Sequence, residues 1–189
     1  MRDRRALLAG ATAVLVAIVA AGVVLARSGD EAPRDAGLPD RPVPWGSRPM
    51  AINATLAPEL AGKDPITGKA VRLADFAGKP VVVNVWASWC PGCNEEAADL
   101  RDFAAAHPEA VVLGIDFQDT QAGAKDFYQR WGWTHPSIWD VSGTKTSALG
   151  LVGMPTTYFL DERHRIVAQV VGATDRAGFE RGLELARKS

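Results

Sequence analysis

Residues 81–93, VVVNVWASWCPGC, constrain this chain more than any other stretch, because an apolar run leads directly into two cysteines. The run Val81–Trp86 is short, rich in β-branched residues and nearly free of polar ones, which is typical of a strand buried on both faces of a mainly parallel sheet. Pro91 suits the first turn of a helix, and residues 94–106 are rich in Ala, Glu, Leu and Phe. The sequence therefore predicts that a buried strand delivers Cys90 to the N-terminus of a helix.

A cysteine in that position is suited to nucleophilic chemistry. The unpaired N–H groups and the dipole of the helix stabilise a thiolate, so we expect Cys90 to be the nucleophile. Cys93 lies one turn later on the same face and deeper, where it can close a disulfide with Cys90 and reopen it by exchange. An inert disulfide and half of a zinc site are the alternatives, although the chain has no third cysteine and its three histidines lack ligand spacing. No metal or other cofactor is expected.

The N-terminus predicts a membrane segment. Arg2, Arg4 and Arg5 precede residues 6–26, which contain no charged side chain. Such a run is long enough to cross a bilayer and exceeds the usual apolar segment of a secretory signal, so residues 1–26 are predicted as an uncleaved transmembrane anchor. The arginine-bearing tail should stay in the cytoplasm, which places the rest of the chain on the extracytoplasmic side of the membrane. Secretion after signal cleavage is the alternative.

Composition divides the remainder of the chain. Residues 27–52 contain five prolines among glycine and charged residues, and this composition predicts a linker because it cannot bury a core. Residues 53–189 are long enough for one domain with a full core. The formal net charge of -1 gives no reason to expect nucleic acid as a partner. We expect the protein to be a monomer.

The expected elements of the domain follow an alternating order. They are a hairpin at 66–73, strands at 81–86 and 110–117, helices at 94–106, 120–131 and 144–150, two antiparallel strands at 156–161 and 165–171, and a closing helix at 175–187. Thr174 is the expected cap of the last helix. The order predicts an α/β fold in which helices flank a central sheet, with a right-handed parallel crossover between the first two main strands.

Two motifs make the chain resemble the thioredoxin superfamily. Residues 89–93 (WCPGC) follow the main strand, and residues 153–156 (GMPT) precede the last pair of strands. More narrowly, the chain is similar to the TlpA/ResA/CcmG-like membrane-anchored thiol-disulfide oxidoreductases, with further support from residues 78–80 (GKP), from Glu96 and from residues 155–161 (PTTYFLD). The resemblance implies a thioredoxin-like fold, a central mixed sheet flanked by helices, with an N-terminal β-hairpin extension.

The resemblance also implies roles for individual residues. Cys90 would attack and Cys93 would resolve, while Pro155 would be a cis-proline beside the disulfide. Met154 would present its backbone to an extended substrate strand. From the sequence alone, Pro155 could equally be a trans proline at the entry of a strand. Trp89 is expected to shield the thiolate and to offer surface to the partner.

The dipeptide between the cysteines departs from the thioredoxin pattern. Pro91 and Gly92 reverse the Gly-Pro order of thioredoxins. These two residues influence the relative stability of thiolate and disulfide, and they are expected to contact the substrate.

A second departure concerns the proton of the resolving cysteine. Thioredoxins carry a buried Asp that relays this proton, and the matching position here is Asn84, which cannot take one. In the TlpA-like branch a carboxylate after the next strand lies near the cysteines, and Asp119 is the closest positional match. Asp119 could instead be a helix cap. Glu96 also follows the family, with a surface ion pair or a favourable interaction with the helix dipole as the alternative.

The function that these residues indicate is exchange of a dithiol with cysteine-containing partner proteins. The resemblance implies reduction of apocytochrome c before haem attachment, with electrons supplied by a membrane thiol-disulfide carrier. Oxidation of folding secreted proteins is the alternative. A copper-handling chaperone on a similar fold is less favoured, because those proteins generally space their cysteines by three residues and add a histidine.

Overall fold

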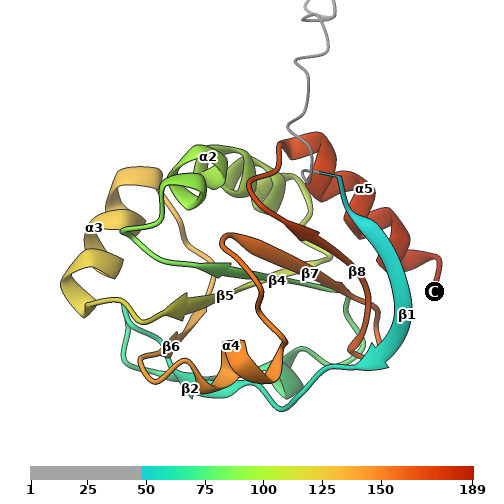
Figure 1. Cartoon of the computed structure of the whole chain (residues 1–189), viewed down its shortest axis with the longest axis horizontal. Coiled ribbons are helices and arrows are strands. Elements are labelled where there is room, and N and C mark those ends of the chain that lie inside the picture. Colours follow the sequence, from blue (N-terminus) through green and yellow to red (C-terminus); the bar gives the residue numbers. More distant parts are fainter. Residues whose placement is uncertain (1–47) are drawn as a thin grey trace, which may run out of the picture. The chain divides into compact units, whose positions relative to one another are not determined.

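The computed structural model describes residues 48–189. The predicted anchor, residues 1–26, and the predicted linker up to residue 47 lie outside the described residues. In the described part of the chain, no helix is both long and apolar enough to span a bilayer. Figure 1 shows that the described residues fold around one six-stranded sheet, accompanied by a two-stranded sheet.

The main sheet is mixed, with the strand order β1-β8-β7-β4-β5-β6. Strands β4, β5 and β6 are parallel to one another, whereas the neighbouring pairs β4–β7, β7–β8 and β8–β1 are antiparallel. The strands are β1 (Met50–Leu56), β4 (Val81–Trp86), β5 (Val111–Phe117), β6 (Ser137–Asp140), β7 (Thr156–Leu160) and β8 (Arg165–Val171). The structure therefore confirms the predicted mixed sheet and its parallel crossover.

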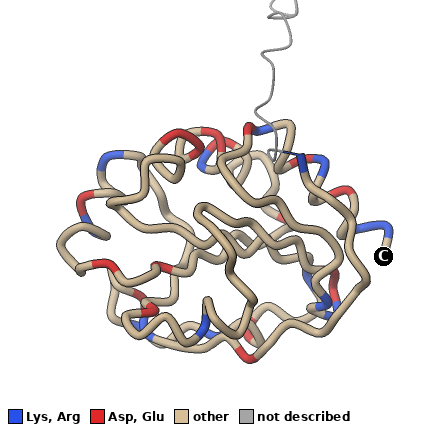
Figure 2. Tube along the Cα trace, in the orientation of Figure 1, with Lys and Arg blue, Asp and Glu red and all other residues tan. Residues whose placement is uncertain are grey.

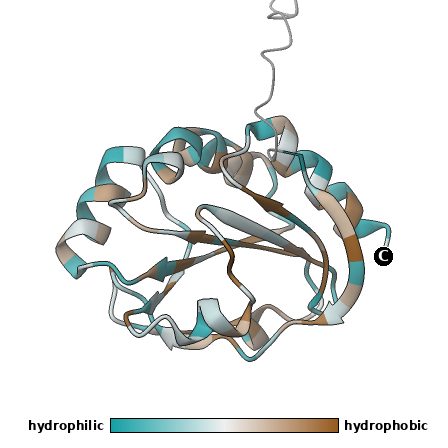
Figure 3. Cartoon of the chain, viewed as in Figure 1, coloured by the Kyte–Doolittle hydropathy of each residue, from teal (hydrophilic) through white to brown (hydrophobic). Residues whose placement is uncertain are grey.

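Helices cover both faces of this sheet (Figure 1). Helices α2, α3 and α5 pack on one face, while α4, the 3-10 helix η1 and the β2–β3 hairpin lie on the other. The elements are α2 (Pro91–Ala106), α3 (Gln121–Trp131), α4 (Thr144–Ala148), α5 (Arg176–Arg187), η1 (Leu73–Phe76), β2 (Ala61–Lys63) and β3 (Ala70–Arg72). Figure 3 shows hydrophobic residues concentrated on the central strands and hydrophilic ones on the outer turns of the helices.

Strand β4 contributes to two cores because its side chains alternate between the faces of the sheet. All six of its residues are buried. Val82 and Trp86 belong to the core under α2, α3 and α5. Val81, Val83 and Val85 belong to the core on the opposite face. The apolar run is thus a central strand covered on both sides, as the sequence predicts.

An aromatic cluster fills the core beneath α3. The Trp86 ring centroid lies 4.8 Å from that of Phe127, 5.5 Å from that of Tyr128 and 5.2 Å from that of Trp133. Phe127 and Tyr128 face inward, as the helical spacing predicts. Trp131, expected on the same face, is only half-buried.

The N-terminal hairpin is present, but its first strand lies earlier than the sequence predicts. Strand β2 pairs antiparallel with β3, and residues 64–69 form the connection. Asp64 explains the shift, because its Oδ1 accepts hydrogen bonds from the N–H groups of Ile66 at 2.9 Å and Thr67 at 2.7 Å. These bonds fold residues 66 and 67 into the turn instead of leaving them extended. Asp64 Oδ2 also accepts from the Ser137 N–H at 2.9 Å, which ties the hairpin to β6.

Strand β1 has no counterpart among the elements that the sequence predicts, and it begins within the last three residues of the predicted linker, 27–52. All of its residues are exposed, and it is held by antiparallel pairing with β8. The prolines before it indicate a linker, and pairing with a strand near the other end of the chain leaves no local signal.

Figure 2 shows charged residues of both signs interspersed on the helices and outer loops of the described chain.

Candidate functional site

The two cysteines lie where β4 ends and α2 begins. Cys90 is the N-cap residue of α2, with an extended backbone (φ -82°, ψ 117°), and Pro91 occupies the first turn. Cys93 follows one turn later, and the two residues form a disulfide with their Cα atoms 5.3 Å apart. The strand–helix junction therefore places both sulfurs at the carboxyl end of the central strand.

The two sulfurs differ in their electrostatic surroundings. Cys90 Sγ accepts a hydrogen bond from the Cys93 backbone N–H at 3.2 Å. This donor is one of the first-turn N–H groups that have no partner within the helix, so it favours negative charge on the Cys90 sulfur when the disulfide opens. Exposure does not separate the two residues, since Cys90 is 3% and Cys93 is 1% exposed. The helix N-terminus is the feature that distinguishes Cys90.

The loop before β7 lies close to the turn between the two cysteines. The Met154–Pro155 peptide bond is cis. A Cβ atom on Gly92 would lie 2.9 Å from Pro155 Cδ, so a glycine between the cysteines allows this close approach. The Gly172 N–H donates to the Pro155 carbonyl at 2.8 Å, which fixes the proline loop to the end of β8.

Trp89 lies beside Cys90 and is 56% exposed. Its Nε1 donates to the Gln118 carbonyl at 3.4 Å, and its ring centroid lies 6.4 Å from that of Phe117. The indole is thus held against the β5–α3 loop while much of its surface remains open to a partner.

Glu96 is buried, not on the surface. It is 2% exposed, and its Oε1 accepts from Asn84 Nδ2 at 2.8 Å while its Oε2 accepts from the Thr174 N–H at 3.0 Å. Burial raises the pKa of Glu96 to about 8, although the bonds from Thr174 and Asn84 act in the opposite direction. The predicted alternative of a surface ion pair is therefore wrong. A signal was present in the sequence, because the buried residues of α2 are at inner-face spacing: Cys93, Glu96, Ala97, Leu100 and Phe103.

Asp119 organises the loop that carries the cysteines. Its Oδ2 accepts from the Ser88 N–H at 2.6 Å and its Oδ1 from the Ser88 hydroxyl at 2.9 Å. Asp119 Oδ1 also accepts from the Thr120 N–H at 2.7 Å. The N-cap of α3 is Thr120, whose hydroxyl accepts from the Gly123 N–H, so the reading of Asp119 as that cap is wrong.

The cap of α5 also differs from the sequence-based expectation. Asp175, not Thr174, is the N-cap residue, and its carboxylate accepts from the Gly178 N–H at 2.8 Å. The backbone of Thr174 is directed to Glu96 instead. The residue before the helix therefore connects α5 to the buried carboxyl on α2.

Sequence reasoning missed another buried carboxylate, Asp116. It lies on β5 opposite Trp86 on one side and Trp139 on the other, and it is fully buried. Neither of its oxygens has a hydrogen-bond partner among the residues that the structure describes. Burial, with the nearby Asp119 and Asp64 carboxylates, raises the pKa of Asp116 to about 8.

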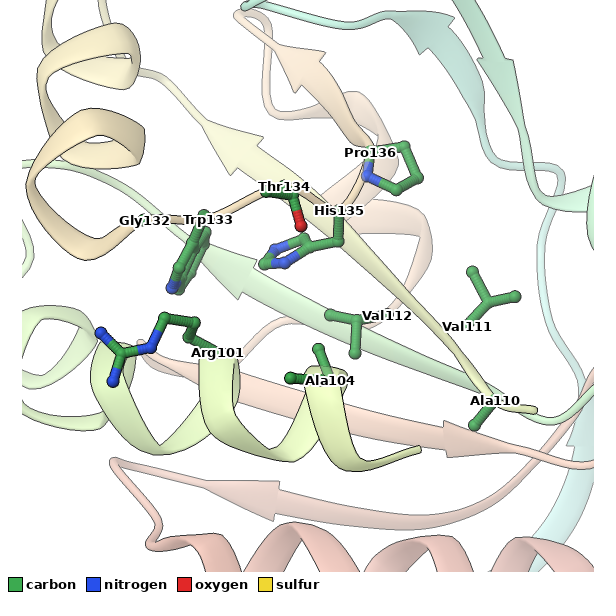
Figure 4. Close-up of a pocket in the computed structure, with 11 residues that line it drawn as sticks. Arg101, Ala104, Ala110, Val111, Val112, Gly132, Trp133, Thr134, His135 and Pro136 are labelled. Atoms are coloured by element: carbon green, nitrogen blue, oxygen red, sulfur yellow. The ribbon is translucent and has the colours of Figure 1, made fainter. Parts of the chain in front are cut away.

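A cavity of about 360 Å³ lies away from the disulfide (Figure 4). It is bounded by α2, the start of β5 and the loop 132–136, and Arg101, Trp133 and His135 are among its lining residues. None of the predicted site residues lines it. Within residues 48–189, no group of three or more His, Cys, Asp or Glu side chains is placed to hold a metal ion.

The chain is similar to known proteins both in sequence and in structure. The model of the AhpC/TSA family matches residues 54–169. The thiol:disulfide interchange protein DsbE of Pseudomonas aeruginosa is 36% identical over 104 residues, which are 54% of this chain and 57% of that protein. The thiol-disulfide oxidoreductase ResA of Bacillus thuringiensis subsp. konkukian is 25% identical over 130 residues, 68% of this chain and 75% of that protein. The chain thus spans little more than half the length of this DsbE.

A solved structure supports the fold assignment. The DsbF homologue from Corynebacterium diphtheriae superposes with a TM-score of 0.67 at 29% sequence identity. The superposition covers 75% of this chain and 94% of that one. The predicted thioredoxin-like fold is confirmed.

Proposed function

Because the chain belongs to the AhpC/TSA family, we propose that it is a thiol-disulfide oxidoreductase of the DsbE/ResA type, which exchanges its Cys90/Cys93 pair with cysteines of partner proteins outside the cytoplasm. The observation that carries the proposal is the disulfide at the N-terminus of α2, with the cis-proline loop packed against its turn. An inert bridge would need neither the N-terminal position of Cys90 nor the approach of Pro155.

In the reductive direction, the Cys90 thiolate attacks one sulfur of a partner disulfide. A new S–S bond forms between Cys90 and the partner, and the other partner sulfur leaves as a thiolate. Cys93 then gives up its proton and attacks the Cys90 sulfur, which closes the Cys90–Cys93 disulfide and releases the second partner thiolate. Two electrons pass to the partner, which becomes a dithiol when its thiolates are protonated.

Glu96 is the group that we propose for the Cys93 proton. It lies three residues after Cys93 on the same buried face of α2, and its pKa of about 8 suits a group that takes up a thiol proton and later returns it. Asp119 is less suited to this role, because its oxygens are already bonded to Ser88 and Thr120. We assign Asp119 to positioning the loop that leads to Cys90.

The partner would dock on the surface around the sulfurs. Exposed Trp89 supplies apolar contact on one side, and the Met154 backbone beside Pro155 offers hydrogen bonds to an extended segment. Pro91 and Gly92 complete the surface between the two. As the family resemblance implies, apocytochrome c is the proposed reductive substrate, and a membrane thiol-disulfide carrier returns the electrons.

We further propose that residues 1–26 anchor the protein in the membrane and that residues 27–52 tether the domain on the extracytoplasmic side. Sequencing the N-terminus of the protein recovered from membrane fractions tests this. An intact N-terminus supports the anchor, whereas a start after residue 26 in a soluble fraction indicates a cleaved signal.

The exchange itself is tested by trapping in intact cells. In Cys93→Ser the resolving step is blocked, so Cys90 should accumulate as a mixed disulfide with its natural partner. Cys90→Ser is the matched control and should trap nothing. Recovery of an apocytochrome supports the reductive role, and recovery of assorted secreted proteins supports oxidation. If Cys93→Ser yields no more adduct than Cys90→Ser, the exchange function is refuted.

A further inference from the structure

We propose that Asn84 is a positioning residue that follows the proton of Glu96: its side-chain amide donates to the charged carboxylate and, rotated by half a turn, accepts from the protonated carboxyl. The inference rests on the proposed function, in which Glu96 exchanges a proton with Cys93. Position 84 matches the buried Asp of thioredoxins. Because Asn cannot take a proton, Asn84 has a different role here.

The first observation is the incomplete bonding of the Asn84 amide. Asn84 lies on β4 and is fully buried. Its Nδ2 donates to Glu96 Oε1 at 2.8 Å and to Thr157 Oγ1 at 3.0 Å, so both of its N–H groups are used. Its Oδ1 is buried and has no hydrogen-bond partner among the described residues. An unpaired buried acceptor is costly and calls for a physical reason.

The second observation is that the groups bonded to Glu96 in this arrangement are donors. Nδ2 of Asn84 faces one carboxylate oxygen, and the backbone N–H of Thr174 faces the other. Two donors suit a carboxylate that carries a charge. Once Glu96 is protonated, however, its hydroxyl needs an acceptor, and a backbone N–H cannot become one.

The Asn84 amide can become that acceptor. A half-turn about its last side-chain torsion exchanges the places of Nδ2 and Oδ1. Oδ1 then takes the position 2.8 Å from Glu96 Oε1 and 3.0 Å from Thr157 Oγ1. In that position it accepts from the Glu96 hydroxyl and from the Thr157 hydroxyl, which is itself able to donate. The rotated orientation therefore pairs the Oδ1 atom that the first orientation leaves without a partner, and the protonation state of Glu96 decides which orientation is favoured.

The described groups that face Asn84 and Glu96 come from α2, β7 and the segment before α5. Asp99, on α2, is the charged group among the described residues that acts on the Glu96 carboxyl. Strand β7 presents the Thr157 hydroxyl, and the segment before α5 presents the Thr174 N–H, while the Asp175 carboxylate caps Gly178. The cysteines on α2 do not titrate while their disulfide is closed.

The consequence for exchange is a carboxyl that stays in place with either charge. A fixed donor at position 84 would offer no acceptor to the hydroxyl of protonated Glu96, so the carboxyl would be fully bonded only in its ionised form. An amide that presents either end holds Glu96 one turn from Cys93 through both halves of the cycle. An Asp at position 84 would instead add a second buried carboxyl that competes for the same proton.

Nuclear magnetic resonance of the oxidised protein tests the rotation directly. The ¹³Cδ signal of Glu96 gives its titration midpoint between pH 5 and 10, and the Asn84 side-chain protons give cross-relaxation contacts to the Thr157 side chain. We expect these contacts above the midpoint and their loss below it. The side-chain amide of Asn94, which donates to the Ser88 and Cys90 carbonyls, is the internal control and should keep its contacts. Contacts between Asn84 and Thr157 that persist across the whole titration refute the proposal.

A variant provides an independent measure. Asn84→Leu removes both the donor and the acceptor, so both forms of Glu96 lose a partner, and its proton affinity should change by about fivefold or less. A fixed donor would stabilise only the charged form, and its loss would raise the affinity by about tenfold or more. Thr157→Val, which keeps the Asn84–Glu96 bond, is the matched control. If Asn84→Leu does not fold, the pH dependence of the Asn84–Thr157 contacts in the wild type still tests the rotation.

The role of Asn84 and the exchange function can be refuted separately. Rotation can be absent while Cys93→Ser still traps partners, which refutes the role of Asn84 alone. Absence of trapped partners refutes the exchange function, whatever the amide does.

Discussion

Replacing Glu96 by Gln should remove a pH-dependent loss of stability that the fold imposes on this carboxyl. Burial raises the pKa of Glu96 to about 8 from an ordinary value of 4.5. The folded state therefore binds this proton more tightly than the unfolded state does, so its stabilising effect is complete below pH 4.5 and is lost as the pH rises through 8. Gln has the shape of protonated Glu and no proton to lose, so the variant should lack this loss.

The contribution of Glu96 to the free energy of unfolding is easiest to isolate between pH 6.5 and 8. Burial lowers the pKa of His135 to about 3 from 6.5, so the opposite slope that His135 contributes is confined to pH values below 6.5. Within this window, a group with a raised pKa lowers the free energy of unfolding by about 1.4 kcal/mol per pH unit, and by less near pH 8. For Glu96 the total loss between pH 6.5 and 8 is about 1.6 kcal/mol. Asp116, whose pKa burial also raises to about 8, should contribute a similar loss.

The assay is denaturant unfolding of the oxidised protein at several pH values across this window, with the disulfide closed so that the cysteines do not titrate. The wild type should lose about 3 kcal/mol of its free energy of unfolding between pH 6.5 and 8, as the sum of the two carboxyl contributions. Glu96→Gln should lose about half of that, Asp116→Asn should match it as a control, and the double variant should be flat. If the wild type and Glu96→Gln lose stability in parallel, the fold does not hold a proton on Glu96.

Three further substitutions test the geometry around the disulfide. Gly92→Ala would place a Cβ atom 2.9 Å from Pro155 Cδ, so thermal unfolding should show a loss of about 1–3 kcal/mol, and a variant as stable as the wild type would contradict this contact. Asp119→Ala removes the acceptor of three hydrogen bonds from Ser88 and Thr120, so the Ser88 backbone amide should exchange its hydrogen with solvent faster. An unchanged exchange rate would show that Asp119 does not hold the loop at Ser88. Trp89→Ala alters an exposed side chain, so it should change stability by only about 0.5 kcal/mol or less. The Trp89→Ala substitution should slow thiol-disulfide exchange with a protein partner more than exchange with a small disulfide. Equal slowing of both reactions would indicate that Trp89 affects the Cys90 thiolate and not the contact with the partner.

Much of the scaffold could be predicted because its signals are local. The apolar run 81–86 indicates a strand buried on both faces, and Pro91 directly after Cys90 indicates where the helix begins. The inner face of α3 follows from its spacing, with Phe127 and Tyr128 buried as expected. These features depend on neighbouring residues, so the sequence contains their cause.

Other features could not be predicted because they depend on contacts between distant segments. Strand β1 exists through pairing with β8, and the Asp64 carboxylate moves the first hairpin strand by bonding residues 66 and 67. Asp116 is fully buried on a strand that lies between β4 and β6, and this arrangement forms only in the folded sheet. Its isolated position in the sequence resembles that of any polar residue at the end of a strand.

The sequence by itself determined that two thiols stand one helical turn apart at the end of a central strand, because that arrangement is written in consecutive residues. Only the tertiary structure decided the surroundings of Glu96, the carboxyl that we propose for the proton of Cys93. Asn84, Glu96, Thr157 and Thr174 come from four segments, and folding brings them to within hydrogen-bond distance in a site without water-exposed surface. Loss of solvent around Glu96 sets its proton affinity, and loss of solvent is a property of the folded chain.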